Sequence, residues 1–171
     1  MLDGLIIIRS KRVKDERGSF LERYQAVRYA DLGINVPFVQ DNEVFSIKNV
    51  LRGLHYQEKP GQAKLISVSQ GSIWDVAVDI RPESSTFGKW HAVELSEENS
   101  LQFFIPVGFA HGYCVLSETA RVTYKVSSLY DPQEEKTIRW DDPQFTIDWP
   151  VRDPILSERD RSAPYLDKVF V

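Results

Sequence analysis

Three side chains suited to proton and charge chemistry lie close together in the first half of the chain. His55 stands three positions after Arg52 and nine before Lys64. Histidine takes up a proton near neutral pH, arginine binds phosphate through paired N–H donors, and a lysine ammonium can stabilise a developing oxyanion. The whole chain contains only 3 histidines, so few other general bases are available. This set points to a proton-transfer enzyme acting on an anionic substrate.

Each of the three residues also suits a structural role. His55 is compatible with a core or turn histidine that bonds the backbone, Lys64 with a solvated lysine at a strand end, and Arg52 with a surface ion pair. The sequence by itself names no carboxylate that would orient His55.

Aromatic and histidine side chains elsewhere offer further candidates. Alternation in Val122–Val126 directs Tyr124 inward, either as a core tyrosine or as a proton donor. Tyr130 stands at a strand end. It is either an ordinary aromatic residue of a loop or a side chain that stacks on a flat ring of a ligand. His111 lies in a glycine-flanked turn, where it fits either a ligand contact or the turn itself. His91 is expected to be structural.

The sequence predicts no metal site. Metal-binding β-barrels often use two histidines at i and i+2, but His55 is followed two positions later by Gln57. His111 could serve as a later ligand, yet two isolated imidazoles make a poor site. The single cysteine, Cys114, excludes an internal disulfide, and its apolar neighbours favour a buried structural thiol.

Length and composition indicate one domain, residues 1–171. Hydrophobic residues make up 42% of the chain, enough for a core, and aromatics 12%. The net charge of -4 argues against nucleic-acid binding. No apolar run approaches the ~20 residues that cross a membrane, and residues 1–8 fit a first strand better than a signal peptide. A reducing, cytoplasmic setting fits the single thiol.

Short alternating runs separated by glycine and proline predict an all-β sandwich or jelly roll. A turn or two of helix is expected over residues 26–32, and the tail around residues 156–160 is expected to pack back over the barrel. The predicted strands are residues 39–47, 64–70, 72–81, 90–95, 102–106, 112–116, 121–127 and 137–140.

Taken in order, these segments resemble the dTDP-4-dehydrorhamnose 3,5-epimerases, sugar-nucleotide epimerases of the cupin superfamily. The resemblance covers nearly the whole chain, and the ordered set is far more specific than any one piece. The matching segments are residues 17–22, 40–42, 51–57, 64–65, 75–81, 85–90 and 105–112, then Tyr124, Lys125, Tyr130, Glu135, Trp140, Leu156, Ser157 and Asp160.

The resemblance implies a cupin-type jelly roll (a double-stranded β-helix) with short helices, which works as a homodimer without metal or cofactor. It implies an isomerase that converts dTDP-4-dehydro-6-deoxy-D-glucose to dTDP-4-dehydro-L-rhamnose by inverting C3 and C5. By the same resemblance, the neighbouring subunit completes the site. Neither nucleic acid nor membrane is an expected partner.

The resemblance also assigns roles to individual residues. His55 would be the base, Asp160 its orienting carboxylate, Tyr124 the acid on the opposite face of the sugar, and Lys64 the group that stabilises the enolate. Tyr130 would stack on the thymine. The other substrate contacts would be Arg17, Glu22, Gln40, Asp41, Asn42, Arg52, His111, Glu135 and Arg159.

Two departures and several alternatives stay open. Val44 stands where family members often have serine, and Arg159 where lysine is common, which keeps the charge but changes its geometry. Alternative functions are a 3-epimerase, another keto-sugar isomerase such as a 3,4-ketoisomerase, and a non-catalytic sugar-nucleotide binding module. A metal-dependent oxygenase of the same fold is disfavoured by Gln57.

Overall fold

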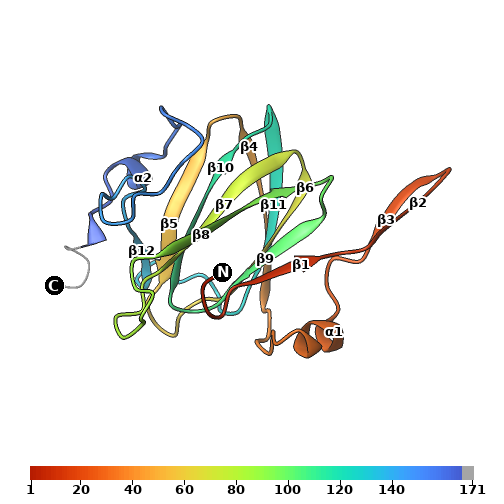
Figure 1. The fold of residues 1–171 in the computed structure, drawn as a ribbon, viewed down its shortest axis with the longest axis horizontal. Coiled ribbons are helices and arrows are strands. Elements are labelled where there is room, and N and C mark those ends of the chain that lie inside the picture. Colours follow the sequence, from red (N-terminus) through yellow and green to blue (C-terminus); the bar gives the residue numbers. More distant parts are fainter. Residues whose placement is uncertain (167–171) are drawn as a thin grey trace.

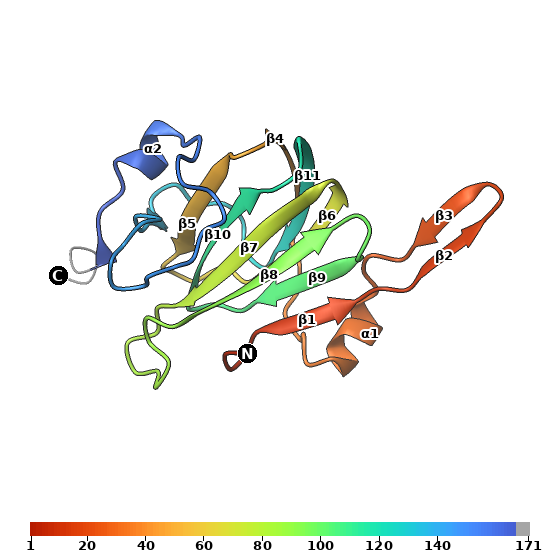
Figure 2. The same ribbon diagram turned by 45° about the horizontal axis from the view of Figure 1, so that its top comes forward.

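The chain folds into two antiparallel five-stranded sheets that face each other across a common interior (Figures 1 and 2). The computed structural model describes residues 1–166. In spatial order the first sheet contains β1 (Ile6–Arg9), β9 (Leu101–Ile105), β6 (Lys64–Gln70), β11 (Thr119–Val126) and β4 (Gln40–Ile47). The second contains β12 (Glu135–Thr137), β5 (Leu51–Gln57), β10 (Phe109–Val115), β7 (Ser72–Asp79) and β8 (Trp90–Ser96). The predicted all-β jelly roll is confirmed.

Alternating side chains fill much of the interior between the sheets. Ile66, Phe103 and Val122 of the first sheet share one buried cluster with Ile73 and Val115 of the second. Because successive residues of a strand point to opposite faces, one apolar set from each sheet is enough to build this core. Arg52 and His55 of β5 and His111 of β10 lie outside this cluster, and there the interior stays open as a cavity.

The C-terminal segment covers the outer face of the second sheet. Phe145 and Leu166 pack against Leu54 and Val76, all four of them buried. The segment includes the short helix α2 (Glu158–Arg161), which contacts β5 (Figure 1). The prediction that the tail packs back over the barrel is confirmed.

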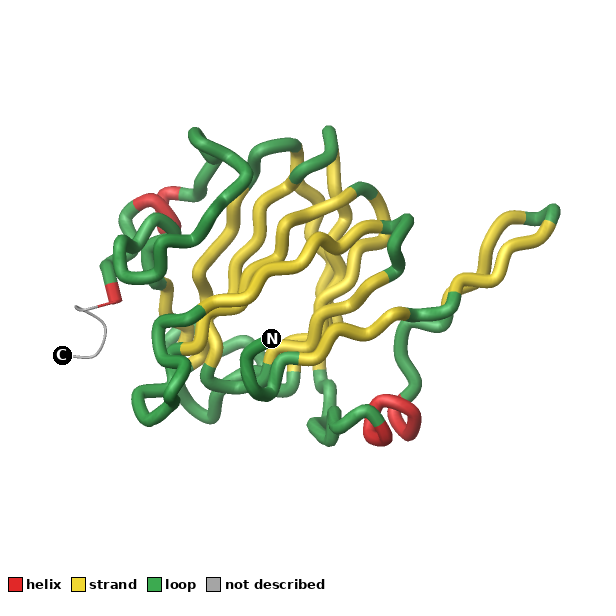
Figure 3. Tube along the Cα trace, in the orientation of Figure 1, coloured by secondary structure: helices red, strands yellow, loops and turns green. Residues whose placement is uncertain are grey.

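The N-terminal part carries a second helix and a projecting hairpin. Helix α1 (Ala26–Asp31) agrees with the predicted helical turns and buries Tyr29 against the outer face of the first sheet. Strands β2 (Arg12–Asp15) and β3 (Gly18–Leu21) pair only with each other and extend away from the sheets (Figure 3). No helix within residues 1–166 is long and apolar enough to span a bilayer.

The predicted strands did not include β5 (Leu51–Gln57), and two predicted strands are displaced. β10 begins at Phe109 rather than at residue 112, so His111 lies inside a strand and not in a turn. The glycines beside it suit close packing between strands as well as they suit turns. β12 occupies Glu135–Thr137 instead of 137–140, because these residues pair with the end of β5.

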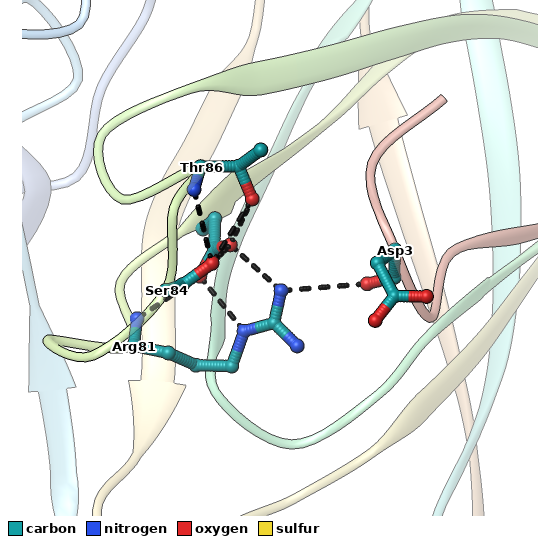
Figure 4. A network of polar contacts seen from close by, with 5 residues as sticks. Asp3, Arg81, Ser84 and Thr86 are labelled. Carbon is teal, nitrogen blue, oxygen red and sulfur yellow. Dashed lines mark hydrogen bonds and ion pairs between the residues drawn. The ribbon is translucent and has the colours of Figure 1, made fainter.

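A buried carboxylate holds the connection between β7 and β8 together. The Asp79 carboxylate accepts hydrogen bonds from Arg81 (2.7 and 2.9 Å), Ser84 (2.6 Å) and Thr86 (2.6 Å), and Arg81 reaches on to the carbonyl of Asp3 (Figure 4). Burial alone would raise the pKa of Asp79, but these donors outweigh it and hold the pKa well below its usual range. The ionised carboxylate therefore ties this loop to the N-terminal segment.

We expect Asp79→Asn to lower the free energy of unfolding by about 3 kcal/mol at pH 7, because the variant breaks a buried charge pair. Since folding lowers the pKa of Asp79, its stabilising contribution is complete above the unfolded-state pKa of about 4 and is lost as the pH falls below that value. Urea unfolding of both proteins at pH 7 and pH 3 should show the difference shrinking at the lower pH.

Asp141→Asn is the matched control, because it removes an ion pair with Arg139 in which both side chains are more than 30% exposed. Its effect should stay below about 1 kcal/mol. Equal losses in the two variants at pH 7 would contradict the role given to Asp79.

Candidate active site

A cavity of about 380 Å³ lies between the two sheets, in the polar part of the interior. The second sheet lines it with Arg52, His55, His111, Tyr113 and Glu135. The first sheet contributes Gln40, Asn42, Val44, Lys64 and Tyr124, and two residues outside the strands, Gln62 and Tyr130, complete the lining. Most residues singled out from the sequence are therefore brought together here.

A bulge in β5 turns Arg52 and His55 to the same face of the sheet. His111 lies opposite His55, and Tyr113 lies opposite Arg52. Three residue steps along β5 thus match two steps along β10, which marks one extra residue in β5. In a regular strand, residues three apart point to opposite faces. The bulge is what lets both side chains enter the cavity.

Glycine permits the close strand contact at this bulge. Gly53 has φ of +128°, and a Cβ built on it would lie 2.5 Å from the Cα of Gly112 and 2.8 Å from the carbonyl oxygen of His111. Any larger residue at position 53 must displace the backbone of β10. The contact therefore sets the spacing between the strands that carry His55 and His111.

His55 is paired with the buried carboxylate of Asp160, which comes from α2 at the far end of the chain. Its Nε2 lies 2.6 Å from Asp160 Oδ1, and the Ser157 hydroxyl accepts a hydrogen bond from the Asp160 N–H (3.1 Å). Burial would raise the pKa of Asp160, but His55 and the Ser157 and Gly53 hydrogen bonds outweigh it and lower that pKa. The carboxylate thus stays ionised and can stabilise an imidazolium.

Lys64 presents a buried amine on the opposite sheet. Its Nζ donates to the carbonyl oxygen of His55 at 3.3 Å, so it reaches across the interior to β5. Burial lowers the pKa of Lys64 to about 8, while the charges of Glu135 and Asp75 act in the raising direction. At neutral pH most of the amine is a cation, whose N–H groups can donate hydrogen bonds to an oxyanion.

Tyr124 lines the same cavity from β11, on the sheet opposite His55. It lies beside Asn42 across the β11–β4 pair, and alternation directs it inward as the sequence predicts. Burial raises the pKa of Tyr124, which keeps its hydroxyl protonated at neutral pH. The cavity thus has a base candidate on one wall and an acid candidate on the other.

A second imidazole–carboxylate pair lies in the second sheet. His111 Nε2 lies 3.1 Å from both carboxylate oxygens of Asp75, and both residues are buried. Burial lowers the pKa of His111 and raises the pKa of Asp75. A largely neutral His111 is therefore held in a fixed orientation beside the cavity.

Positive charge at the edge of the cavity comes from two arginines. Arg52 donates to the Ser46 hydroxyl at 3.2 Å and is exposed enough to meet a ligand. Arg159 donates to Glu135 (2.6 Å) and to the Thr137 hydroxyl (2.8 Å), which places it next to the cavity wall formed by Glu135. The two guanidinium groups can bind an anionic ligand that extends out of the cavity.

Three of the expected substrate contacts do not reach this cavity within one chain. Asp41 alternates with Asn42 and therefore faces outward, where it pairs with Lys125. Arg17 lies at the tip of the projecting hairpin and pairs with Asp15. Glu22 follows the hairpin and pairs with Arg28.

Some cavity groups were not assigned a role from the sequence. Tyr113 and Gln62 line the cavity, and Asp75 holds His111. Asp75 stands in the alternating β7 on the same face as Asp79, and a carboxylate that a strand buries needs a partner. No three His, Cys, Asp or Glu side chains within residues 1–166 cluster as metal ligands do.

The family model described as dTDP-4-dehydrorhamnose 3,5-epimerase matches residues 1–168. The chain belongs to this epimerase family. The dTDP-4-dehydrorhamnose 3,5-epimerase of Methanothermobacter thermautotrophicus is 50% identical over 164 residues, which cover 94% of this chain and 89% of that protein. A dTDP-4-dehydrorhamnose 3-epimerase of Streptomyces niveus is 35% identical, over 95% of this chain and 79% of its own length.

A solved member of the epimerase family has the same fold. It is the dTDP-6-deoxy-D-glucose-3,5-epimerase of Legionella pneumophila Philadelphia 1, crystallised with dTDP-4-keto-L-rhamnose. It matches with a TM-score of 0.94 and 52% identity, over 97% of this chain and 89% of that one. The family assignment makes the present chain an isomerase of the epimerase class.

We expect the side-chain NMR signal of Lys64 to titrate with a midpoint near pH 8, because burial lowers its pKa to about 8. The signal is identified by its absence from Lys64→Arg. Glu135→Gln should move the midpoint to lower pH, because it removes the charge that raises this pKa most. A midpoint near the ordinary value of 10.5 would contradict the buried position of the amine.

Proposed function

We propose that the protein is a dTDP-4-dehydrorhamnose 3,5-epimerase that converts dTDP-4-dehydro-6-deoxy-D-glucose to dTDP-4-dehydro-L-rhamnose. One observation carries the proposal: His55, which is paired with Asp160 of α2, and Tyr124 belong to facing sheets and line the same cavity. Inversion of a carbon needs proton removal on one face and proton delivery on the other. The keto-sugar nucleotide bound to the Legionella relative supports the substrate class.

The first chemical step is proton removal beside the ketone. The C4 carbonyl acidifies the C–H bonds at C3 and C5. The His55 nitrogen that does not contact Asp160 takes one of these protons, and the electron pair of the broken C–H bond moves to the C4 oxygen as an enolate. The Lys64 ammonium stabilises that charge, which develops mainly in the transition state and therefore favours turnover over affinity.

The second step returns a proton from the other side. The Tyr124 hydroxyl gives its proton to the same carbon on the opposite face, the enolate collapses to the ketone, and the carbon is inverted. His55 is left as imidazolium and Tyr124 as phenolate, and exchange with solvent restores both. The reaction is redox-neutral, so we propose that it uses neither metal nor cofactor.

The remaining cavity residues suit the nucleotide. Arg52 and Arg159 provide bidentate donors for the diphosphate. Tyr130, which is 54% exposed at the cavity, can stack on the thymine. Hydrogen bonds to the sugar and nucleotide are assigned to Gln40, Asn42, His111 and Glu135.

We propose that the enzyme is a homodimer in which each cavity receives the hairpin of the other subunit. Val13 and Phe20 face each other across β2 and β3, and they are 52% and 70% exposed. An isolated two-stranded hairpin with apolar side chains in water is marginal by itself. A neighbouring subunit would cover it and bring Arg17 and Glu22 to a second cavity.

We also propose that residues 1–171 work as one domain in the cytoplasm. Leu5 near the start packs in the core between the sheets, and Leu166 packs on the outer face of the second sheet. The one cysteine, Cys114, is a buried thiol whose pKa burial raises to about 11. A protonated, buried thiol is compatible with a reducing compartment.

Incubation of the protein with dTDP-4-dehydro-6-deoxy-D-glucose in D2O tests the reaction directly. We expect deuterium at both C3 and C5 by NMR, together with inverted product. Label at C3 alone would make the protein a 3-epimerase, like the Streptomyces niveus relative by its name. Absence of label at both carbons would leave a binding module or another sugar as substrate.

His55→Ala should lower the labelling rate at both carbons by about 10²–10⁴-fold, the usual contribution of a general base. Tyr124→Phe should keep exchange at one carbon or both but form little inverted product, because the opposite-face donor is missing. Binding of dTDP, measured by calorimetry, should change little in either variant. Full inversion by Tyr124→Phe would remove its assignment as the acid.

A mixed dimer tests whether the site is shared. One subunit carries Arg17→Ala and the other His55→Ala, each with a different affinity tag. In a shared site the first subunit keeps its own His55 and receives Arg17 from the second, so the mixed dimer should recover about half of the wild-type activity. Activity no higher than the mean of the two parent variants would contradict a composite site.

A further inference from the structure

Gln57 connects the strand that carries His55 to a loop of the facing sheet. It is the last residue of β5, two positions after His55, and its side chain is only 5% exposed. Its Nε2 donates to the Ser128 hydroxyl and to the Leu129 carbonyl, both at 3.2 Å, and its Oε1 accepts from the Asp131 N–H at 2.9 Å. Both polar atoms of the amide are thus used on the loop that follows β11.

Two of these bonds hold the peptide groups on either side of Tyr130. The Leu129 carbonyl belongs to the peptide group before Tyr130, and the Asp131 N–H belongs to the peptide group after it. Peptide groups are planar, so fixing both of them restricts the two backbone torsions of Tyr130. One side chain therefore determines where the Tyr130 side chain leaves the backbone.

The other bonds of this loop lie on either side of Leu129 and Tyr130: the Ser128 hydroxyl donates to the Gly61 carbonyl at 2.9 Å, and the Asp131 carbonyl accepts from the Glu135 N–H at 2.9 Å. The side chains of Leu129 and Tyr130 are 66% and 54% exposed, so packing in the core contributes little to their position. Gln62 donates to the Ser128 carbonyl at 2.9 Å, which secures the loop one residue earlier. A buried, fully bonded amide is costly to disturb, because each lost partner leaves a polar group unsatisfied.

We propose that Gln57 is a positioning residue that sets Tyr130 at the mouth of the cavity and, through it, the orientation of the bound nucleotide sugar. The inference rests on the proposed function and assigns a role to a residue that does not touch the substrate. β5 then supplies both the base and the support for the group that aligns the sugar with it. Inversion at two carbons depends on that alignment, since a misplacement of about 1 Å can cost 10²-fold in rate.

Gln57→Glu is the most selective variant. The carboxylate has the same shape and can still accept the Asp131 N–H, but it cannot donate to the Leu129 carbonyl. Gln57→Met keeps the length of the side chain and removes all three bonds without adding a charge, so the comparison does not depend on one variant folding. Gln133→Glu, on the exposed part of the same loop, makes the same chemical change as a control.

The variants are compared with Tyr130→Ala and with the double variant Gln57→Glu/Tyr130→Ala. Calorimetry gives the affinity for dTDP, and NMR in D2O gives the initial ratio of label at C5 to label at C3. We expect Gln57→Glu and Tyr130→Ala each to weaken dTDP binding about tenfold, the order of one lost base–aromatic stack, and to shift the ratio in the same direction. The double variant should be no weaker than Tyr130→Ala, and Gln133→Glu should match the wild type.

Wild-type affinity and label ratio in both Gln57 variants would overturn the inference. So would additive losses in the double variant, because Gln57 would then act independently of Tyr130. Failure of the wild type to incorporate any label concerns the proposed function instead. The dTDP affinities of the wild type, Gln57→Glu, Tyr130→Ala and the double variant still decide whether Gln57 and Tyr130 are coupled.

Discussion

The contact between the backbones of β5 and β10 at Gly53 and Gly112 is the constraint on which the site depends. The extra residue in β5 at this point brings Arg52 and His55 to one face, and the missing side chain at Gly53 lets the strands approach. In a regular ladder, either Arg52 or His55 would point away from the cavity, toward the C-terminal segment on the outer face of the second sheet. His55 and Arg52 therefore line the same cavity because of one local irregularity.

Around this contact the interior is divided by polarity. The apolar half separates the sheets, and in the polar half the titratable side chains are held by partners from other elements. His55 has Asp160 of α2, His111 has Asp75 of β7, and Lys64 has the His55 carbonyl. Such pairs lie in a low-dielectric surrounding, where fixed donors act more strongly on developing charge than they do in water. This arrangement suits enolate chemistry, in which a single negative charge appears and disappears.

Much of the fold could be predicted from period-two alternation. The strand over residues 64–70 and the inward direction of Tyr124 follow from it directly. The bulge in β5 could not be predicted, because it depends on the contact with Gly112, far along the chain. Alternation within β4 also separates two residues that the resemblance had grouped as substrate contacts: Asn42 lines the cavity, while its neighbour Asp41 faces outward.

Side-chain pairs between residues far apart in the sequence could not be predicted from local spacing. Asp160 lies 105 positions from His55, and only the family resemblance pointed to the pair. Asp75 was visible as a carboxylate in an alternating strand, yet its partner His111 appeared to belong to a turn. Gln57 shows the reverse case: the residue that breaks a metal-binding pattern has a definite place in the structure, as the support of the Tyr130 loop.

The central claim is that the base and the acid stand on opposite faces of the substrate ring. A crystal structure with dTDP-glucose, which lacks the 4-ketone and does not react, tests it most directly. We predict that the sugar occupies the cavity between the sheets, with the His55 imidazole on one face of the ring, the Tyr124 hydroxyl on the other, and Lys64 Nζ within hydrogen-bond distance of O4. A sugar with both side chains on the same face, or one bound outside this cavity, would contradict the account.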